Sequence, residues 1–328
     1  MEYQDFINYQ MEYLPFGQPP IIEDHLMLFE YNENWGDDLM RSANFYVEAL
    51  QHNSVYLKIP TRVVFISDYS ENAKAAVFDG RGLIVWHGGL LLRQMEILNR
   101  FQEIEDALAG TPLAQLLPSL DNHPSILFFQ MVQHFTFYHE MGHIIQIQEK
   151  ARETTEEFNA DNVFDLARHI LEIDADEFSS LFLASHVLQY AHGIFQDVNQ
   201  EIITGMVSLF LVPILTDSIS IYPDDLQNLN FEQGVHPHPI FRILFIAMVV
   251  ADFVNQRYQD QFTIDPREIL NHTLNVASQL TGVDLVSLWA ENYVDLMEYF
   301  KNVRGRAFPE GFKSAVDAWN EEIEQREA

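Results

Sequence analysis

The chain has 328 residues, of which 49 are acidic, 18 are Lys or Arg and none is Cys, so its formal net charge is −31. A field of this sign repels nucleic-acid phosphates and anionic lipid head groups, which argues against a nucleic-acid partner. The absence of Cys excludes disulfides, thiolate metal sites and cysteine catalysis, and it fits a reducing compartment. Apolar residues make up 48% of the sequence, enough for a substantial core, so the chain is not a disordered acidic tail.

The sequence predicts neither a secretory signal nor a membrane span. It begins Met-Glu-Tyr-Gln-Asp, which is acidic and lacks the apolar run of a signal peptide. The most apolar uncharged run, residues 202–216, is shorter than the roughly 18 to 20 residues that a span needs. We therefore expect a cytoplasmic protein without membrane anchoring.

In chain order, the apolar pattern first predicts a helix over residues 37–51. Short β-branched or aromatic runs between residues 54 and 87 then predict a small sheet of three or four strands, and the Asp-Gly-Arg-Gly sequence at 79–82 indicates a hairpin. A charged stretch at 149–159 predicts a surface turn. Helical patterns cover residues 90–108, 125–150, 161–190, 200–220, 239–257, 266–280 and 284–300.

These elements predict an α+β protein in which a small N-terminal β-sheet is followed by a mostly helical body. We find no internal repeat, no low-complexity linker and no strong boundary. We therefore expect one domain over residues 1–328, with an N-terminal α/β lobe at 1–120 and a helical lobe at 121–328.

The helix expected over residues 125–150 contains His139-Glu140-Met141-Gly142-His143. Residues four apart lie on one helix face, so the two imidazoles can converge on one metal ion with Glu140 beside the open coordination position. Apolar residues flank this stretch on both sides, which argues against a solvated face. Polar groups buried in such a helix must be hydrogen-bonded or bind a metal.

A catalytic zinc ion usually takes three protein ligands, and the following helix offers a third in Glu172. Asp176 is again four residues later, so it is placed to accept the free ring N–H of a ligand histidine. The neighbouring Asp174 and Glu177 are expected on a solvated charged face. These residues predict a metal site between two helices.

The combination of His-Glu-x-x-His with Glu-x-x-x-Asp about thirty residues later resembles the gluzincin metallopeptidases. The Glu-x-x-Ala-Asp form found at 172–176 is most similar to the HtpX and CAAX-prenyl-protease group and to the Lit-type phage-exclusion peptidases. The His-Pro-His-Pro-Ile-Phe-Arg segment at 236–242 is similar to a His-Pro…Arg segment of those families. The likeness covers only the segments 139–143, 172–176 and 236–242.

The resemblance implies a set of site residues and one zinc ion per chain. The zinc ligands would be His139, His143 and Glu172, the general base Glu140 and the residue supporting the ligands Asp176. It also implies that His236 or Arg242 lies near the oxyanion or the ligand carboxylate. The chain lacks the membrane spans of the HtpX group, which favours a soluble, Lit-like peptidase.

The expected function is therefore that of a zinc-dependent endopeptidase acting on a protein or peptide substrate through a metal-bound water, with Glu140 as general base. An extended substrate could add to a sheet edge, for which residues 82–87 are the candidate. The acidic charge favours basic or neutral substrate segments. The alternative is a zinc-stabilised binding or sensor protein that uses the same ligands without turnover. Glu140 favours the enzyme, because a structural site does not need it and usually contains Cys.

Several further side chains were weighed. Tyr138 and Tyr293 are candidates to polarise a substrate carbonyl, and Arg242 is expected to pair with a carboxylate. His238 is expected to belong to a rigid turn, whereas for His236 a turn and a place in the site are equally supported. A di-iron centre is excluded, because it needs two Glu-x-x-His elements and this chain has one.

Overall fold

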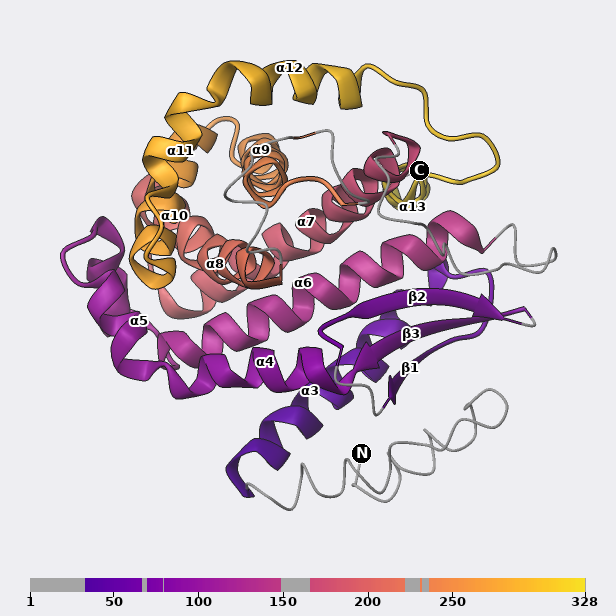
Figure 1. Cartoon of the computed structure of the whole chain (residues 1–328), viewed down its shortest axis with the longest axis horizontal. Coiled ribbons are helices and arrows are strands. Elements are labelled where there is room, and N and C mark those ends of the chain that lie inside the picture. Colours follow the sequence, from indigo (N-terminus) through magenta and orange to yellow (C-terminus); the bar gives the residue numbers. More distant parts are fainter. Residues whose placement is uncertain are drawn as a thin grey trace. The chain divides into compact units, whose positions relative to one another are not determined.

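The computed structural model describes residues 33–66, 70–78, 80–148, 166–221, 231 and 236–327. A three-stranded sheet near the N-terminus precedes a body made of helices (Figure 1). This confirms the predicted α+β class. The charged stretch at 149–159 and the residue Val235 lie outside the described residues.

The chain divides into two compact units, each built from segments that are distant in sequence. The first unit comprises Met1–Glu96, His139–Asn159 and Glu310–Ala328, and the second comprises Ile97–Tyr138 and Ala160–Pro309. The expectation of one domain with lobes at 1–120 and 121–328 stays a prediction.

The described residues of the first unit form the sheet and several helices. Its elements are α3 (Glu33–His52), the 3₁₀ turn η1 (Ser54–Tyr56), β1 (Thr61–Ile66), β2 (Ala73–Phe78), β3 (Arg81–His87), α4 (Gly88–Glu96), the second part of α6 (Pro124–Ile147) and α13 (Ala315–Glu327). Helix α3 packs against β1, and α4 follows directly on β3 (Figure 1). Tyr46 of α3 and Trp86 of β3 are fully buried, and their rings stack with centroids 5.3 Å apart.

The sheet has the strand order β1-β3-β2, with β3 parallel to β1 and antiparallel to β2. Phe78 pairs with Arg81, so the expected hairpin is present, and Gly80 in its two-residue turn has a left-handed φ of 71°. Because β3 is paired on both sides, the proposal that residues 82–87 form a substrate-binding edge is wrong. An edge could not be read from the sequence, since all three strands have similar apolar character.

The run at 55–60, expected as a possible first strand, forms a 3₁₀ turn and a bend instead. The backbone N–H of Lys58 donates to Oε1 of Gln148 at 2.7 Å, and Gln148 Nε2 donates to the carbonyl of Tyr56 at 3.1 Å. The Tyr56 ring stacks on Trp319 of α13 with centroids 6.0 Å apart. Side chains that are distant in sequence therefore satisfy the polar groups that a strand would pair in a ladder.

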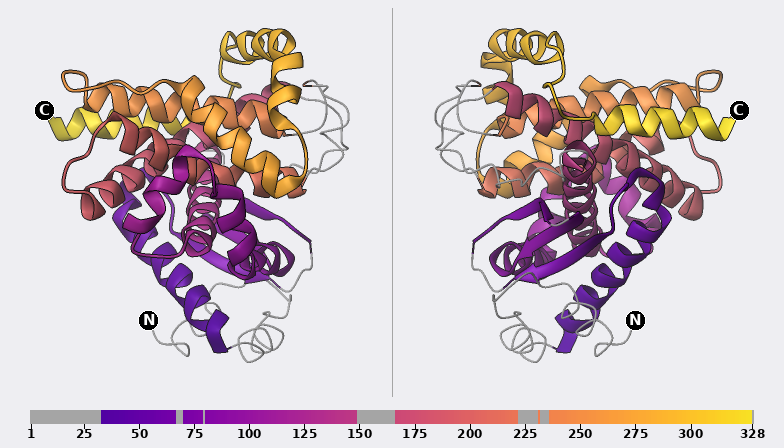
Figure 2. Two further views of the ribbon diagram at one scale, coloured as in Figure 1. Left: turned by 90° about the vertical axis from the view of Figure 1, so that its left-hand side faces the viewer. Right: turned by 90° about the vertical axis from the view of Figure 1, so that its right-hand side faces the viewer.

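The second unit is helical throughout its described residues. Its elements are η2 (Ile97–Asn99), α5 (Phe101–Leu108), η3 (Pro112–Ser119), the first part of α6, α7 (Leu166–Ile194), α8 (Gln200–Ile221), α9 (Pro239–Arg257), α10 (Pro266–Thr281), α11 (Leu285–Glu291) and α12 (Tyr293–Arg304). Helix α8 packs against α7, α9 and α10, and α7 packs against α9 and α12 (Figure 2). One large apolar cluster fills the space between these helices.

Most predicted helix starts agree with the structure, above all the two at proline, Pro239 and Pro266. Two predicted helices are each broken into two. The helix expected over 90–108 ends at Glu96 and resumes as α5, and the one expected over 284–300 is interrupted at Asn292 between α11 and α12. The C-terminal helix α13 was not predicted.

Helices α8 and α9 are long and apolar enough to cross a membrane by length and composition alone. Helix α8 is longer than the uncharged run 202–216, because it includes polar residues on both sides of that run and reaches 22 residues. In the structure, 83% of the apolar window of α8 and 67% of that of α9 are buried, as in core helices of a globular protein.

Candidate metal centre

His139 and His143 lie one turn apart on α6, as the i, i+4 spacing predicts. Their Nε2 atoms are 3.1 Å apart, so both rings present the same nitrogen to one point. Two imidazole nitrogens that bind one zinc ion at about 2.0–2.1 Å with tetrahedral angles are separated by roughly 3.3 Å. The spacing of the two nitrogens therefore fits a shared metal ion without rearrangement.

Gln146, three residues after His143, fixes the orientation of that imidazole. Its Oε1 accepts a hydrogen bond from Nδ1 of His143 at 2.8 Å, which directs the Nε2 lone pair of His143 towards His139. Gln146 is 1% exposed, and its backbone carbonyl accepts from the N–H of Lys313 at 3.2 Å. Sequence reasoning missed this residue, although a polar side chain at i+3 on the ligand face was a usable signal.

In the second unit, α7 and the start of α9 bring four of the predicted site residues together in two pairs. Nδ1 of His236 lies 3.0 Å from Oε2 of Glu172, an ion-pair distance without the alignment of a hydrogen bond. Arg242 donates from Nε and Nη2 to the two oxygens of Asp176 at 2.7 and 2.6 Å. Asp176 is fully buried and the Arg242 side chain is 13% exposed.

The Asp176–Arg242 pair confirms that Arg242 pairs with a carboxylate. It also shows that Asp176 accepts hydrogen bonds from an arginine, where a ligand histidine was expected. A carboxylate has about four acceptor sites, so this bidentate pair leaves room for a further donor. Asp174 is only 8% exposed, so its expected place on a solvated face is wrong.

One ligand atom from each of His139, His143 and Glu172 lies within 4.8 Å of the other two. These are the three residues that the sequence singled out as metal ligands. Glu140, the residue between the two histidines, is 6% exposed. Two imidazoles and one carboxylate are a donor set that suits zinc and other divalent transition metals, and three protein ligands leave a coordination position for a substrate or water.

The other candidates have structural contacts. His238 caps α9, because its Nδ1 accepts from the N–H of Ile240 at 3.2 Å, which confirms its assignment to a rigid turn. The hydroxyl of Tyr138 lies 3.2 Å from Nε2 of His186. Tyr293 is 44% exposed and lines a cavity between α10 and α11.

His134, one turn before the histidine pair, has a strongly perturbed pKa. Desolvation in the partly buried environment, and secondarily the nearby charge of His186, lowers its pKa from 6.5 to about 3. The two rings lie 5.2 Å apart, and burial also lowers the pKa of His186. Both imidazoles are therefore neutral at physiological pH.

Comparison of the chain with protein-family models, with curated proteins and with solved structures gives no match.

Proposed function

We propose that this protein is a zinc-dependent endopeptidase of the gluzincin type that acts in the cytoplasm and hydrolyses peptide bonds in a protein substrate. The proposal depends on one observation, the convergence of ligand atoms from His139, His143 and Glu172. Glu140 lies between the two histidines on α6, and we place its carboxylate beside the coordination position that the three ligands leave open. A site that only holds structure has no use for an additional buried carboxylate at that position.

The metal would be held by His139, His143 and Glu172, and the tautomer set by Gln146 supports this ligand role for His143. A zinc ion held there would lower the pKa of a water molecule and polarise the scissile carbonyl. His236 lies against the Glu172 carboxylate and is 36% exposed, so it is accessible to a substrate. Asp176 and Arg242 tie α7 to α9 next to the turn of helix that carries Glu172.

The chain's own residues then supply the proton transfers. The Glu140 carboxylate accepts a proton from the attacking water and returns it to the nitrogen of the leaving amine. His236 or Arg242 is the cationic or hydrogen-bonding group proposed to stabilise negative charge on the carbonyl oxygen. Among the described strands, β1 and β2 are the outer ones, and an extended substrate would pair with one of them. The net charge of −31 favours basic or neutral substrate segments.

The test compares the wild type with Glu140→Gln, which keeps the size of the side chain and removes the base. Each protein is loaded with zinc, analysed for metal content and incubated with a proteome-derived peptide library, and new termini are identified by mass spectrometry. We expect one zinc ion per chain in both proteins. We also expect Glu140→Gln to lose at least about 10²-fold in cleavage rate, since a general base typically contributes 10²–10⁴-fold.

Glu298→Gln is the matched control, because it makes the same chemical change at an exposed residue of α12. Cleavage unaffected by Glu140→Gln would refute the proposed role of Glu140. Stoichiometric zinc without any cleavage would favour a zinc-stabilised binding or sensor protein. A wild-type chain that binds no divalent metal would refute both.

A further inference from the structure

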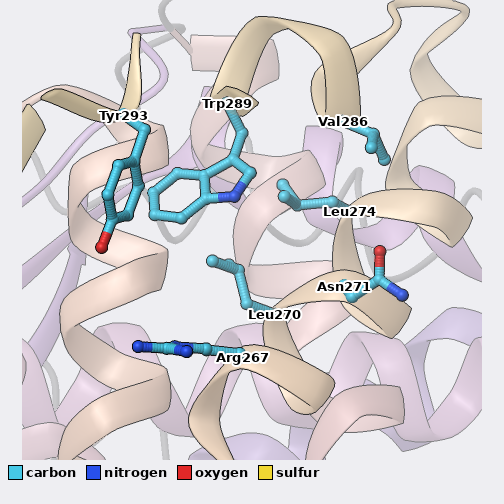
Figure 3. Close-up of a pocket in the computed structure, with 7 residues that line it drawn as sticks. All are labelled: Arg267, Leu270, Asn271, Leu274, Val286, Trp289 and Tyr293. Atoms are coloured by element: carbon cyan, nitrogen blue, oxygen red, sulfur yellow. The ribbon is translucent and has the colours of Figure 1, made fainter. Parts of the chain in front are cut away.

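The second unit has a cavity of about 320 Å³ between α10 and α11, with Tyr293 at the start of α12 also lining it. Its walls are Leu270, Leu274, Val286 and Trp289, and its polar residues include Arg267 and Tyr293 (Figure 3). None of these residues belongs to the candidate metal centre. The cavity is formed within one unit, so its shape follows from the packing of α10, α11 and α12 alone.

Arg267 supplies the positive charge at this cavity, although the acidic residues Asp265 and Glu268 flank it in the sequence. Its backbone N–H donates to the capping carboxylate of Asp265 at 2.8 Å, but among the residues that the structure describes no carboxylate forms an ion pair with its guanidinium. Arg267 also lies in the first turn of α10, where the positive end of the helix dipole disfavours a cation. The Arg267 side chain is exposed and lines the cavity, so its guanidinium is available to pair with an anionic ligand there.

The cavity has a cationic side and a largely aliphatic side. In Figure 3 the guanidinium of Arg267 and the hydroxyl of Tyr293 lie on the same side, whereas Val286 and Leu274 lie on the opposite one, together with the amide of Asn271. The Trp289 ring forms part of the wall between them and meets Tyr293 edge-on, with centroids 5.2 Å apart. Tyr293 is 44% exposed, so the cationic side opens to solvent.

We propose that this cavity binds a small amphipathic carboxylate. Its head group pairs with the Arg267 guanidinium, and its aromatic or branched aliphatic body packs against Trp289 and the aliphatic wall. At the packing density of protein interiors, the volume suits a ligand on the order of a dozen non-hydrogen atoms. The negative charge of the chain repels anions at long range, but screening limits this effect to a Debye length of about 8 Å, so contact with Arg267 decides binding.

The test uses 4-phenylbutyrate as the probe and its neutral amide, 4-phenylbutyramide, as the matched ligand. The chain has four Trp residues, so ¹H–¹⁵N spectra resolve four indole N–H signals, and Trp289→Phe identifies the relevant one. We expect a saturable shift of the Trp289 signal with 4-phenylbutyrate. The amide should bind at least about tenfold more weakly, because it cannot make the charge-assisted contact.

Arg267→Gln should weaken binding of 4-phenylbutyrate by at least about tenfold. Arg257→Gln is the matched control, since it removes the same charge from an exposed arginine at the end of α9 that does not line the cavity. The affinity of this control should equal that of the wild type. The indole signals of the other three Trp residues report whether each variant remains folded.

The carboxylate could belong to a free acid or to the C-terminus of a peptide, and N-acetyl-Ala-Ala-Phe separates these sources. A shift with the tripeptide acid assigns the site to peptide C-termini, and a shift with 4-phenylbutyrate alone assigns it to free acids. The proposal is overturned if the Trp289 signal does not move up to about 10 mM ligand, if the amide binds equally well, or if Arg267→Gln has no effect. The metal centre plays no part in these outcomes.

Discussion

Replacing Arg242 by Met should strongly destabilise the second unit. The Asp176 side chain is fully buried, and both of its oxygens accept hydrogen bonds from Arg242 at 2.6–2.7 Å. Removal of one partner of a buried ion pair leaves a charge that has lost its solvation, which costs about 3–5 kcal/mol. We expect a fall of this size in the free energy of unfolding at neutral pH, measured by urea denaturation followed by circular dichroism.

The pair Glu177–Arg304 provides the matched control, because it also joins α7 to a neighbouring helix. Its closest N–O distance is 3.5 Å and its side chains are 28% and 48% exposed. Arg304→Met should therefore cost less than about 1 kcal/mol, even with the loss of the contact between its guanidinium and the Phe245 ring. Equal costs for the two arginine variants would refute the argument from burial. The double variant Asp176→Asn/Arg242→Met should recover part of the loss, because no uncompensated charge remains.

Three further predictions concern neighbouring features. Gln146→Leu should weaken zinc binding about 10–100-fold and Gln146→Glu should strengthen it, as measured by competition with a chelating dye, because the side chain at this position sets the basicity of His143. His134 takes up a proton near pH 6.5 when unfolded but only near pH 3 when folded, so its burial lowers stability as the pH falls through this window. The resulting decrease in the free energy of unfolding reaches about 2 kcal/mol at pH 5. The urea midpoint of His134→Gln should therefore depend less on pH than that of the wild type. Gly205→Val should cost about 1–3 kcal/mol in a thermal melt, because a Cβ at Gly205 would lie 2.7 Å from Cδ1 of the buried Leu116. Unchanged zinc affinity, an unchanged pH profile or an unchanged melting temperature would each contradict the corresponding argument.

The parts of the site that lie on one helix could be predicted from the sequence. His139 and His143 are one turn apart on any α-helix, so their convergence follows from spacing alone. Gln146 obeys the same geometry, and the prediction omitted it only because a neutral amide is a less familiar partner for a ligand histidine than a carboxylate.

Partners on different helices could not be predicted in the same way. The sequence indicated that Arg242 pairs with a carboxylate, but 49 acidic residues were available and only the packing of α9 on α7 selects Asp176. The order of the strands is a similar case, because β3 becomes central through its pairing with β1, which precedes it by two strands.

The cavity between α10 and α11 could not be predicted from the sequence. Arg267, Trp289 and Tyr293 look like ordinary surface residues of three separate helices, and the break at Asn292 that places Tyr293 at the cavity was itself unforeseen. In general, the predicted fold class depended on local periodicity, whereas the contacts that create sites depended on which helices pack together.

The segment Glu310–Ala328 completes the first unit, where Lys313 meets Gln146 and Trp319 meets Tyr56. During synthesis, the ribosome therefore releases the sheet, the histidine-bearing helix and all of the second unit before residues 310–327 exist to finish the first. Nascent chains halted before that point would expose the ring of Tyr56 and leave the Gln146 carbonyl without its contact to Lys313. Such products should be more sensitive to cellular proteases than chains that include residues 310–327, which gives quality control a way to remove them.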